Sequence, residues 1–127
     1  MRYPSFNEVA DVLEKVLQKI SKPGTWTQGA FARDAHGRAL SDPDKIPYSG
    51  MKPACWCIQG AIMSEVRKAP GNASRNLLLG ACIDAIGVKN TTAWNDRETT
   101  TQTRVLKRLS AAIKRLRQNA RIIKHDA

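Results

Sequence analysis

Residues 101–124 read TQTRVLKRLSAAIKRLRQNARIIK, and this stretch decides the fold class. At about 100° per residue, its apolar side chains fall on one arc and its basic side chains on the opposite arc. Leu106 lies on the border between the two arcs, and Ile122 is the exception to the pattern. The stretch therefore predicts one long amphipathic helix, roughly 36 Å in length at 1.5 Å per residue, and a mainly α fold.

Three further helices are predicted upstream, at about 5–21, 54–69 and 74–86. Each range carries apolar side chains at the three- and four-residue spacing that lines one face of a helix. Gly87 is well placed to end the third of them, because glycine tolerates the left-handed conformation of a C-terminal cap. We therefore expect a single domain over the whole 127-residue chain, with about four helices around one core.

The segments between these helices are predicted to be less regular. Residues 25–40 favour a small β-hairpin or an ordered loop, with a turn at Asp34 to Gly37. Residues 41–53 contain three prolines and a glycine, which is typical of a loop. A polar connection is expected at 89–100.

Composition restricts the function classes. Lys plus Arg is 21 and Asp plus Glu is 11, so the formal net charge is +10. The longest nearly apolar run, 77–83, is far shorter than the roughly 20 residues of a membrane-spanning helix, so no membrane partner is expected. With no secretory signal and an odd cysteine count of three, a reducing cytoplasm is the expected location.

The strongest chemical signal is the charge of the last helix. From 99 to 125 the chain has no Asp or Glu but eight basic residues: Arg104, Lys107, Arg108, Lys114, Arg115, Arg117, Arg121 and Lys124. These residues predict a polyanion-binding surface for nucleic acid or an acidic protein surface, although a merely solvated face is the alternative. Acids of the first helix, such as Glu8, Asp11 and Glu14, could neutralise some of them. The last helix has no aromatic residue for stacking, so phosphate contacts are expected of it.

A second candidate is a polar and aromatic group outside the predicted helices: Trp26, Gln28, Arg33, Asp34, Trp94, Asn95 and Asp96. One interpretation is a small polar pocket that binds a ligand. The other is a network that pins loops, in which Asn95 or Asp96 caps the last helix and Asp34 bonds its own turn.

Evidence for catalysis or a metal is weak. Cys55, Cys57 and Cys82 do not have the spacing of a zinc site, and they read better as reduced thiols, with Cys57 and Cys82 buried on helices. A nucleophilic Cys55 with His36 as its base would require matched geometry. We therefore expect a non-enzymatic protein with no metal and no cofactor.

Three motifs in order resemble a known family: WTQGAFARDAHG at 26–37, WCIQGAI at 56–62 and AWND at 93–96. This family consists of small bacterial and phage proteins known only as a domain of unknown function. The resemblance covers roughly residues 7–118 and implies a shared fold and core but no reaction.

The leading interpretation is a small basic binding protein that engages nucleic acid or another polyanion through the cationic face of its last helix. One alternative is a phage or mobile-element protein that binds and modulates a host protein. Another is a small enzyme or ligand-binding pocket near Trp26, Asp34 and Asn95.

Overall fold

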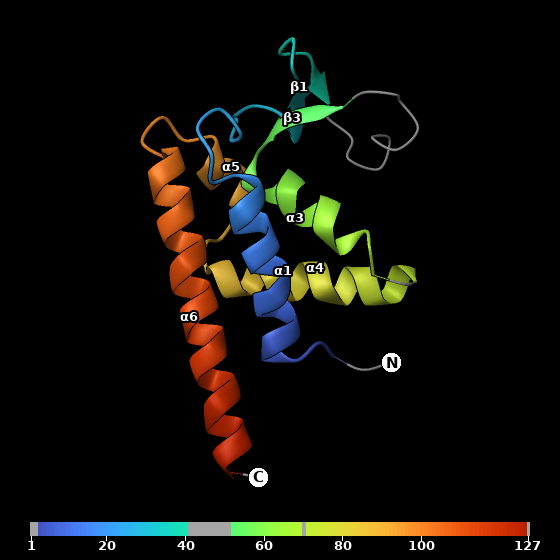
Figure 1. The fold of residues 1–127 in the computed structure, drawn as a ribbon, viewed down its shortest axis with the longest axis vertical. Coiled ribbons are helices and arrows are strands. Elements are labelled where there is room, and N and C mark those ends of the chain that lie inside the picture. Colours follow the sequence, from blue (N-terminus) through green and yellow to red (C-terminus); the bar gives the residue numbers. More distant parts are fainter. Residues whose placement is uncertain (1–2, 41–51, 70, 127) are drawn as a thin grey trace.

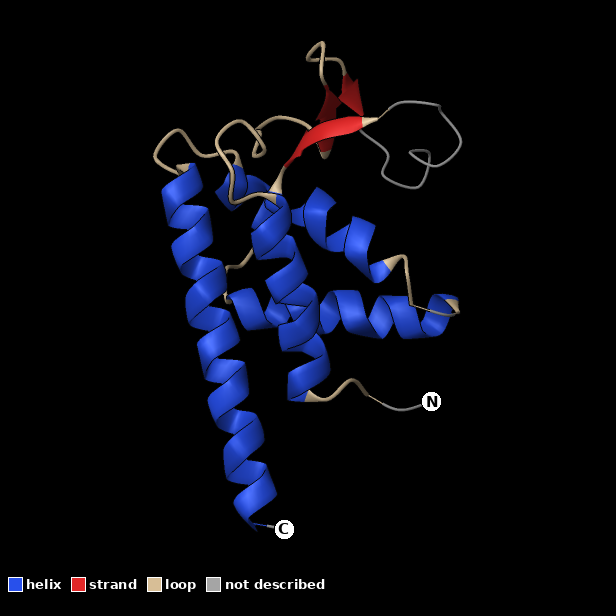
Figure 2. Ribbon diagram, viewed as in Figure 1, coloured by secondary structure: helices blue, strands red, loops and turns tan. Residues whose placement is uncertain are grey.

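A computed structural model describes residues 3–40, 52–69 and 71–126, with side chains described except at positions 72, 73 and 124–126. In chain order its elements are α1 (Phe6–Lys19), β1 (Ala32–Asp34), β2 (Ala39–Leu40), β3 (Pro53–Trp56), α3 (Ile58–Val66), α4 (Asn72–Ile86), α5 (Thr91–Asn95) and α6 (Gln102–Asp126). The helices form the body of the molecule and a small sheet sits at one end (Figure 2), which confirms the predicted mainly α class. Positions 41–51 of the predicted proline-rich loop lie outside the described residues.

The core lies where α1 meets α6, α3 and α4. α1 and α6 run antiparallel, side by side, and α4 crosses behind α1 (Figure 1). α6 buries the positions that its periodicity predicts: Val105, Leu109, Ala112 and Leu116. The last turns of α6 extend beyond this core, so Ile123, predicted on the apolar face, is 57% exposed, as is its neighbour Ile122 at 58%.

The sheet has three antiparallel strands in the order β2-β1-β3, so the predicted hairpin is only part of it. The predicted helix 54–69 is wrong in its first turn, because residues 53–56 form β3. Cys55 pairs with Arg33 of β1, and the Trp56 N–H donates to the Thr25 carbonyl at 2.9 Å. These contacts come from residues more than 20 positions earlier, and they outweigh a local helical tendency.

Helix α3 begins where the sheet ends. Cys57 is buried at its N-cap, and the Cys57 Sγ accepts a hydrogen bond from the Gly60 N–H at 3.2 Å. A Cβ on Gly60 would lie 2.0 Å from the Phe31 carbonyl oxygen. Glycine therefore permits the close approach of α3 to the segment before β1.

Capping side chains mark the N-termini of α1 and α6, and a glycine marks the C-terminus of α4. The Ser5 Oγ accepts from the Glu8 N–H at 3.1 Å at the start of α1, and Gly87 ends α4 with φ of 78°. At the start of α6, the Thr101 Oγ1 accepts from the Arg104 N–H at 3.3 Å. The expectation that Asn95 or Asp96 caps this helix is therefore wrong.

Helix α5 lies inside the predicted connection 89–100. The Asn90 Oδ1 accepts from the Ala93 N–H at 2.9 Å and caps the helix. The hydroxyls of Thr91 and Thr92 both donate to the Gln59 Oε1 on α3. Five residues are too few for a helical period to be visible in sequence, and tertiary contacts hold this turn in place.

One carboxylate is buried between α1 and α3. The Glu65 side chain is 4% exposed, and its oxygens lie 2.7 Å from the Lys19 Nζ and 3.0 Å from the Lys68 Nζ. Lys19 also lies 4.6 Å from the centre of the Trp56 ring. Burial would raise the pKa of Glu65, but the hydrogen bonds from the two lysines outweigh burial and hold this pKa below its ordinary value.

Candidate functional site

Asn95 is the centre of the predicted polar group, and it is completely buried. Its Oδ1 accepts from the Trp26 indole N–H at 2.8 Å and from the Ile58 backbone N–H at 3.0 Å. Its Nδ2 donates to the Thr27 carbonyl and to the Asp96 Oδ1, both at 3.1 Å. One amide side chain thus joins the loop before β1, the start of α3 and the end of α5.

Gln28 and Asp96 extend this Asn95 network to its neighbours. The Gln28 Nε2 donates to the Asn95 carbonyl at 2.8 Å and to the Arg97 carbonyl at 2.9 Å. The Asp96 Oδ1 accepts from the Gly29 N–H at 3.0 Å. Arg33 joins from β1, because its guanidinium donates to the Gln28 carbonyl at 3.1 Å. The polar groups of this network therefore form hydrogen bonds with one another.

Asp34 and Trp94 lie outside the network. The Asp34 Oδ1 accepts from the backbone N–H groups of His36 and Arg38, each at 2.9 Å, so Asp34 bonds its own turn. Burial would raise the pKa of Asp34, but hydrogen bonds from Arg38 and the His36 N–H lower it overall. The Trp94 side chain faces a different region, next to Arg108 of α6.

Little empty space adjoins the Asn95 network. A cavity of about 140 Å³, lined by Gly29, Ala30, Phe31, Thr92 and Asp96, adjoins it. This is below the roughly 300 Å³ at which small-molecule sites begin. Every buried polar side-chain atom within the described ranges has a hydrogen-bond partner.

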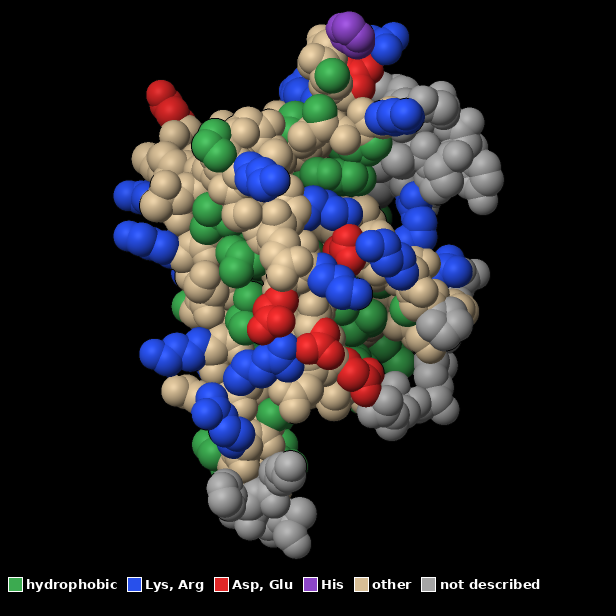
Figure 3. Space-filling model, viewed as in Figure 1, with side chains coloured by type: hydrophobic (Ala, Val, Ile, Leu, Met, Phe, Trp, Pro, Cys, Tyr) green, Lys and Arg blue, Asp and Glu red, His purple; other side chains and the backbone are tan. Residues whose placement is uncertain are grey.

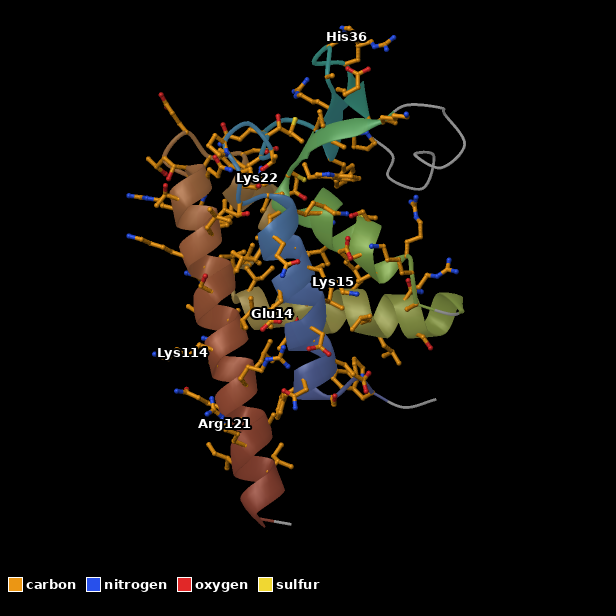
Figure 4. All side chains as sticks on the ribbon, viewed as in Figure 1. Glu14, Lys15, Lys22, His36, Lys114 and Arg121 are labelled. Carbon is orange, nitrogen blue, oxygen red and sulfur yellow. The ribbon has the colours of Figure 1, made fainter. Side chains whose placement is uncertain are left out.

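Within the described residues, no arrangement of side chains supports the catalytic or the metal-binding alternative. The Cys55 Sγ lies 3.9 Å from the Arg33 carbonyl oxygen, whereas His36 is at the exposed tip of the β1–β2 turn (Figure 4). No group of three or more metal-binding side chains occurs among the residues that the structure describes.

The predicted cations of α6 divide into three sets, and Arg117 alone forms the first. Its guanidinium lies 2.7 Å from the Asp11 carboxylate and 3.0 Å from the Glu14 carboxylate, both on α1. Hydrogen bonds from Arg117 to Asp11 and Glu14 raise the pKa of the guanidinium. Acids of the first helix therefore neutralise this cation, as the sequence suggested for some of the eight basic residues.

Arg108 and Arg115 form the second set, at the C-terminal end of α4. The Arg108 guanidinium donates to the carbonyls of Ile86 at 2.9 Å and Gly87 at 3.1 Å, and Arg115 donates to the Ala85 carbonyl at 2.6 Å. Positive charge is favourable at a helix C-terminus, where carbonyl groups lack helical partners. These arginines fasten α4 to α6 and keep their charge.

The third set, here called the outer face of α6, consists of Arg104, Lys107, Lys114 and Arg121. All four are exposed, and within the described part of the chain none of them contacts a carboxylate. Lys114 projects away from α1, whereas Glu14 lies between the two helices in this view (Figure 4). Arg121 lies nearer to α1, because its Nε donates to the Arg117 carbonyl at 3.4 Å and it lines a surface hollow together with Asn7 and Arg117. Figure 3 shows basic side chains along the outer edge of α6 and acidic ones gathered over α1. The side chain of Lys124 lies outside the described residues.

Comparison with known proteins gives a family. A model of a family of unknown function, DUF6197, matches residues 4–115. The chain belongs to the DUF6197 family. No curated protein and no solved structure matches it. The DUF6197 match includes the whole Asn95 network and the first three residues of the outer face of α6, but it ends before Arg121.

Sequence reasoning about this DUF6197 protein missed residues whose role depends on the fold. Lys89 and Arg97 line a surface cavity with Trp94, but they precede the acid-free segment, which begins at residue 99. A tryptophan flanked by cations in a polar connection was the available signal. None of the described helices is both long enough and apolar enough to span a bilayer.

Proposed function

We propose that this DUF6197 protein is a non-enzymatic binding protein that holds nucleic acid on the outer face of α6. The observation that carries the proposal is the difference between Arg117, which contacts two carboxylates, and the outer face, which contacts none in the described residues. Cations without local counter-ions create a positive potential that favours a polyanion.

The spacing of these cations suits an extended partner. Lys107, Lys114 and Arg121 recur every seven residues, which is about 10.5 Å along the helix with a drift of about 20° per step. The distance from Arg104 to Arg121 is about 26 Å, the length of roughly seven to eight base pairs at 3.4 Å each. A linear row of this length supports a linear polyanion better than a compact anion.

The residues between the cations also favour close approach. Thr103, Ser110, Ala111 and Gln118 occupy the same exposed side of α6, and none of them is acidic or bulky. A phosphate backbone could therefore lie near the helix without meeting a repelling charge. The basic side chains supply affinity in this arrangement, whereas base-specific contacts are not required.

The test is binding of labelled oligonucleotides measured by fluorescence anisotropy at several salt concentrations. With four to six phosphate contacts, log K for duplex DNA should fall against log salt with a slope of about −4 to −5. At salt concentrations between roughly 50 and 200 mM, the double variant Lys114→Glu with Arg121→Glu should bind at least about tenfold more weakly than the wild type.

The matched control is Lys15→Glu combined with Lys22→Glu, which makes the same change in net charge on exposed lysines outside α6 (Figure 4). This control should retain most of the affinity. Equal loss in both double variants would reduce the effect to net charge and contradict a site on α6. Absence of oligonucleotide binding at low salt would also overturn the proposal. Capture of one acidic protein that survives nuclease digestion would then favour the protein-binding alternative.

A further inference from the structure

A surface cavity beside α5 has a composition that the Asn95 network lacks. It has a volume of about 470 Å³ and is lined by Val88, Lys89, Asn90, Ala93, Trp94 and Arg97. This volume is within the range of small-molecule sites. The cavity combines one large aromatic ring with two exposed cations, and its lining contains no carboxylate.

Trp94 differs from the other two tryptophans in how its ring is used. The Trp26 indole N–H is bonded to Asn95, and the Trp56 ring carries Lys19 at 4.6 Å. Trp94 is half-buried, and no residue in the described ranges accepts a hydrogen bond from its indole N–H. Part of this ring therefore remains available to a partner.

A fixed cation adjoins the ring. The Arg108 guanidinium carbon lies 6.0 Å from the centre of the Trp94 ring, and its donors are held by the carbonyls of Ile86 and Gly87. Arg108 is on α6, one turn from Arg104 and next to Lys107. Arg108 does not line the cavity, but it links the Trp94 ring to the part of α6 that carries Arg104 and Lys107.

The two acidic residues next to Arg97 in sequence, Asp96 and Glu98, are both absent from the cavity lining, and Glu98 is exposed. The Asp96 Oδ1 accepts hydrogen bonds from the Gly29 N–H and the Asn95 amide. Lys89 and Arg97 therefore provide two cations at the cavity wall with the ring between them in sequence.

We propose that this cavity, here called the Trp94 pocket, receives an unpaired nucleobase of a single-stranded nucleic acid whose phosphates contact Lys89, Arg97 and the outer face of α6. The inference rests on the proposed function and narrows its substrate class. Aromatic side chains stack on bases irrespective of sequence, and neighbouring cations follow the backbone. A base paired within a duplex does not offer its face, so the Trp94 pocket distinguishes single strands from duplexes.

The decisive experiment compares two single strands of the same length, oligo(dT) and a strand of abasic sites, at one salt concentration. Both carry the same phosphates, so only the bases differ. We expect the protein to bind oligo(dT) about 5- to 150-fold more tightly, the range that corresponds to stacking of one base. Free thymidine monophosphate should bind far more weakly than oligo(dT), because it lacks the other phosphates.

Two variants locate the preference at the ring. Trp94→Leu should reduce the affinity for oligo(dT) to that for the abasic strand while leaving the abasic affinity unchanged. Trp94→Phe retains an aromatic face and should retain most of the preference. Quenching of tryptophan fluorescence by oligo(dT) should be seen in the wild type and lost in Trp94→Phe.

The outcomes separate this inference from the proposed function. Equal affinity for oligo(dT) and the abasic strand, both lowered by Lys114→Glu with Arg121→Glu, would overturn the Trp94 pocket and leave the outer face of α6 supported. Binding of neither strand at low salt would overturn both. Tighter binding of a nucleoside monophosphate than of oligo(dT) would also overturn the inference, since it would indicate a free nucleotide as the ligand.

Discussion

The Asn95 network and the outer face of α6 use polar groups in opposite ways. Around Asn95, four hydrogen bonds join segments that are up to 69 residues apart, and the amide is completely buried. On the outer face of α6, four cations stand exposed without a carboxylate contact in the described residues. The polar side chains around Asn95 stabilise the fold, whereas the four cations of the outer face of α6 are not paired with carboxylates in the described residues.

This difference is a guide to reading polar clusters. A buried polar group without a partner costs free energy, so a cluster whose members all bond to one another has its structural explanation already. A row of like charges without acidic neighbours repels itself, so the stability of the fold does not explain it. The predictions below therefore expect large stability effects in the first region and binding effects in the second.

The largest expected effect is that of Asn95→Ala, which should lower the free energy of unfolding by about 2–5 kcal/mol. The Trp26 indole N–H and the Ile58 backbone N–H would both lose their acceptor inside the protein. Urea unfolding followed by circular dichroism measures the loss. Asn119→Ala, on α6 and partly exposed, should change stability by less than about 0.5 kcal/mol. Equal unfolding midpoints for the two variants would contradict the role of the network.

Glu65→Gln should cost about 1–3 kcal/mol at neutral pH, because two lysines lose a charged partner. The pKa of Glu65 in the folded protein is below the ordinary value of 4.5, so its stabilisation is present above that pH and is lost as the pH falls through the folded pKa. The gap in urea midpoint between the wild type and Glu65→Gln should therefore narrow in acid. Glu98→Gln, at an exposed position, is the control, and a gap that stays constant down to acid pH would argue against the buried pair.

The two ring replacements Trp26→Phe and Trp94→Phe should separate structure from binding. Trp26→Phe removes the indole donor to Asn95 and should cost about 1–2 kcal/mol of stability. Trp94→Phe removes no hydrogen bond made within the described residues and should cost less. Thermal unfolding of both variants side by side measures the difference, and the reverse order of stabilities would show that the two rings have been assigned the wrong roles.

The smallest expected effects are those of Arg117→Ala and Lys114→Ala. Arg117→Ala removes a partly exposed ion pair and should cost about 0.2–1 kcal/mol, whereas Lys114→Ala should leave stability nearly unchanged. In binding the order should reverse, because Lys114→Ala removes one phosphate contact and reduces the salt slope by about 1. If Arg117→Ala reduced the salt slope and Lys114→Ala did not, the binding surface would instead lie where α6 contacts α1, around Arg117.

Sequence reasoning predicted the elements whose signal is local and repeated. α1 and α6 show a helical period along most of their length, and α4 is indicated by its apolar residues at 77–86 and by Gly87 at its end. The structure places all three helices close to the expected bounds. β3 is only four residues long and depends on β1 and Thr25, so its local sequence could not show that the chain is extended there. The same limit hid α5, whose five residues are held by Gln59 of α3.

The candidate sites divide along the same line. The charge of α6 is visible in sequence because it requires only that acids be missing from a long segment. The sequence could not show which cations form contacts within the fold, because Arg117 pairs with Asp11 and Arg108 bonds the Ile86 carbonyl only after the helices pack. The residues that line the Trp94 pocket lie close together in sequence, at 88–97, but their sequence could not show that they fold around a cavity or that Arg108 of α6 lies against the ring.

The three thiols of the chain differ greatly in their access to solvent. Cys57 and Cys82 are 2% and 0% exposed, and burial raises the pKa of Cys82 to about 12, whereas Cys55 is only partly covered on β3. A thiolate, not a thiol, reacts with alkylating reagents. A maleimide dye should therefore attach to a single position in the native protein, and a brief pulse of a second reagent would count molecules that have opened. The rate at which Cys57 and Cys82 become labelled would therefore report the unfolding of the wild-type chain without an introduced probe.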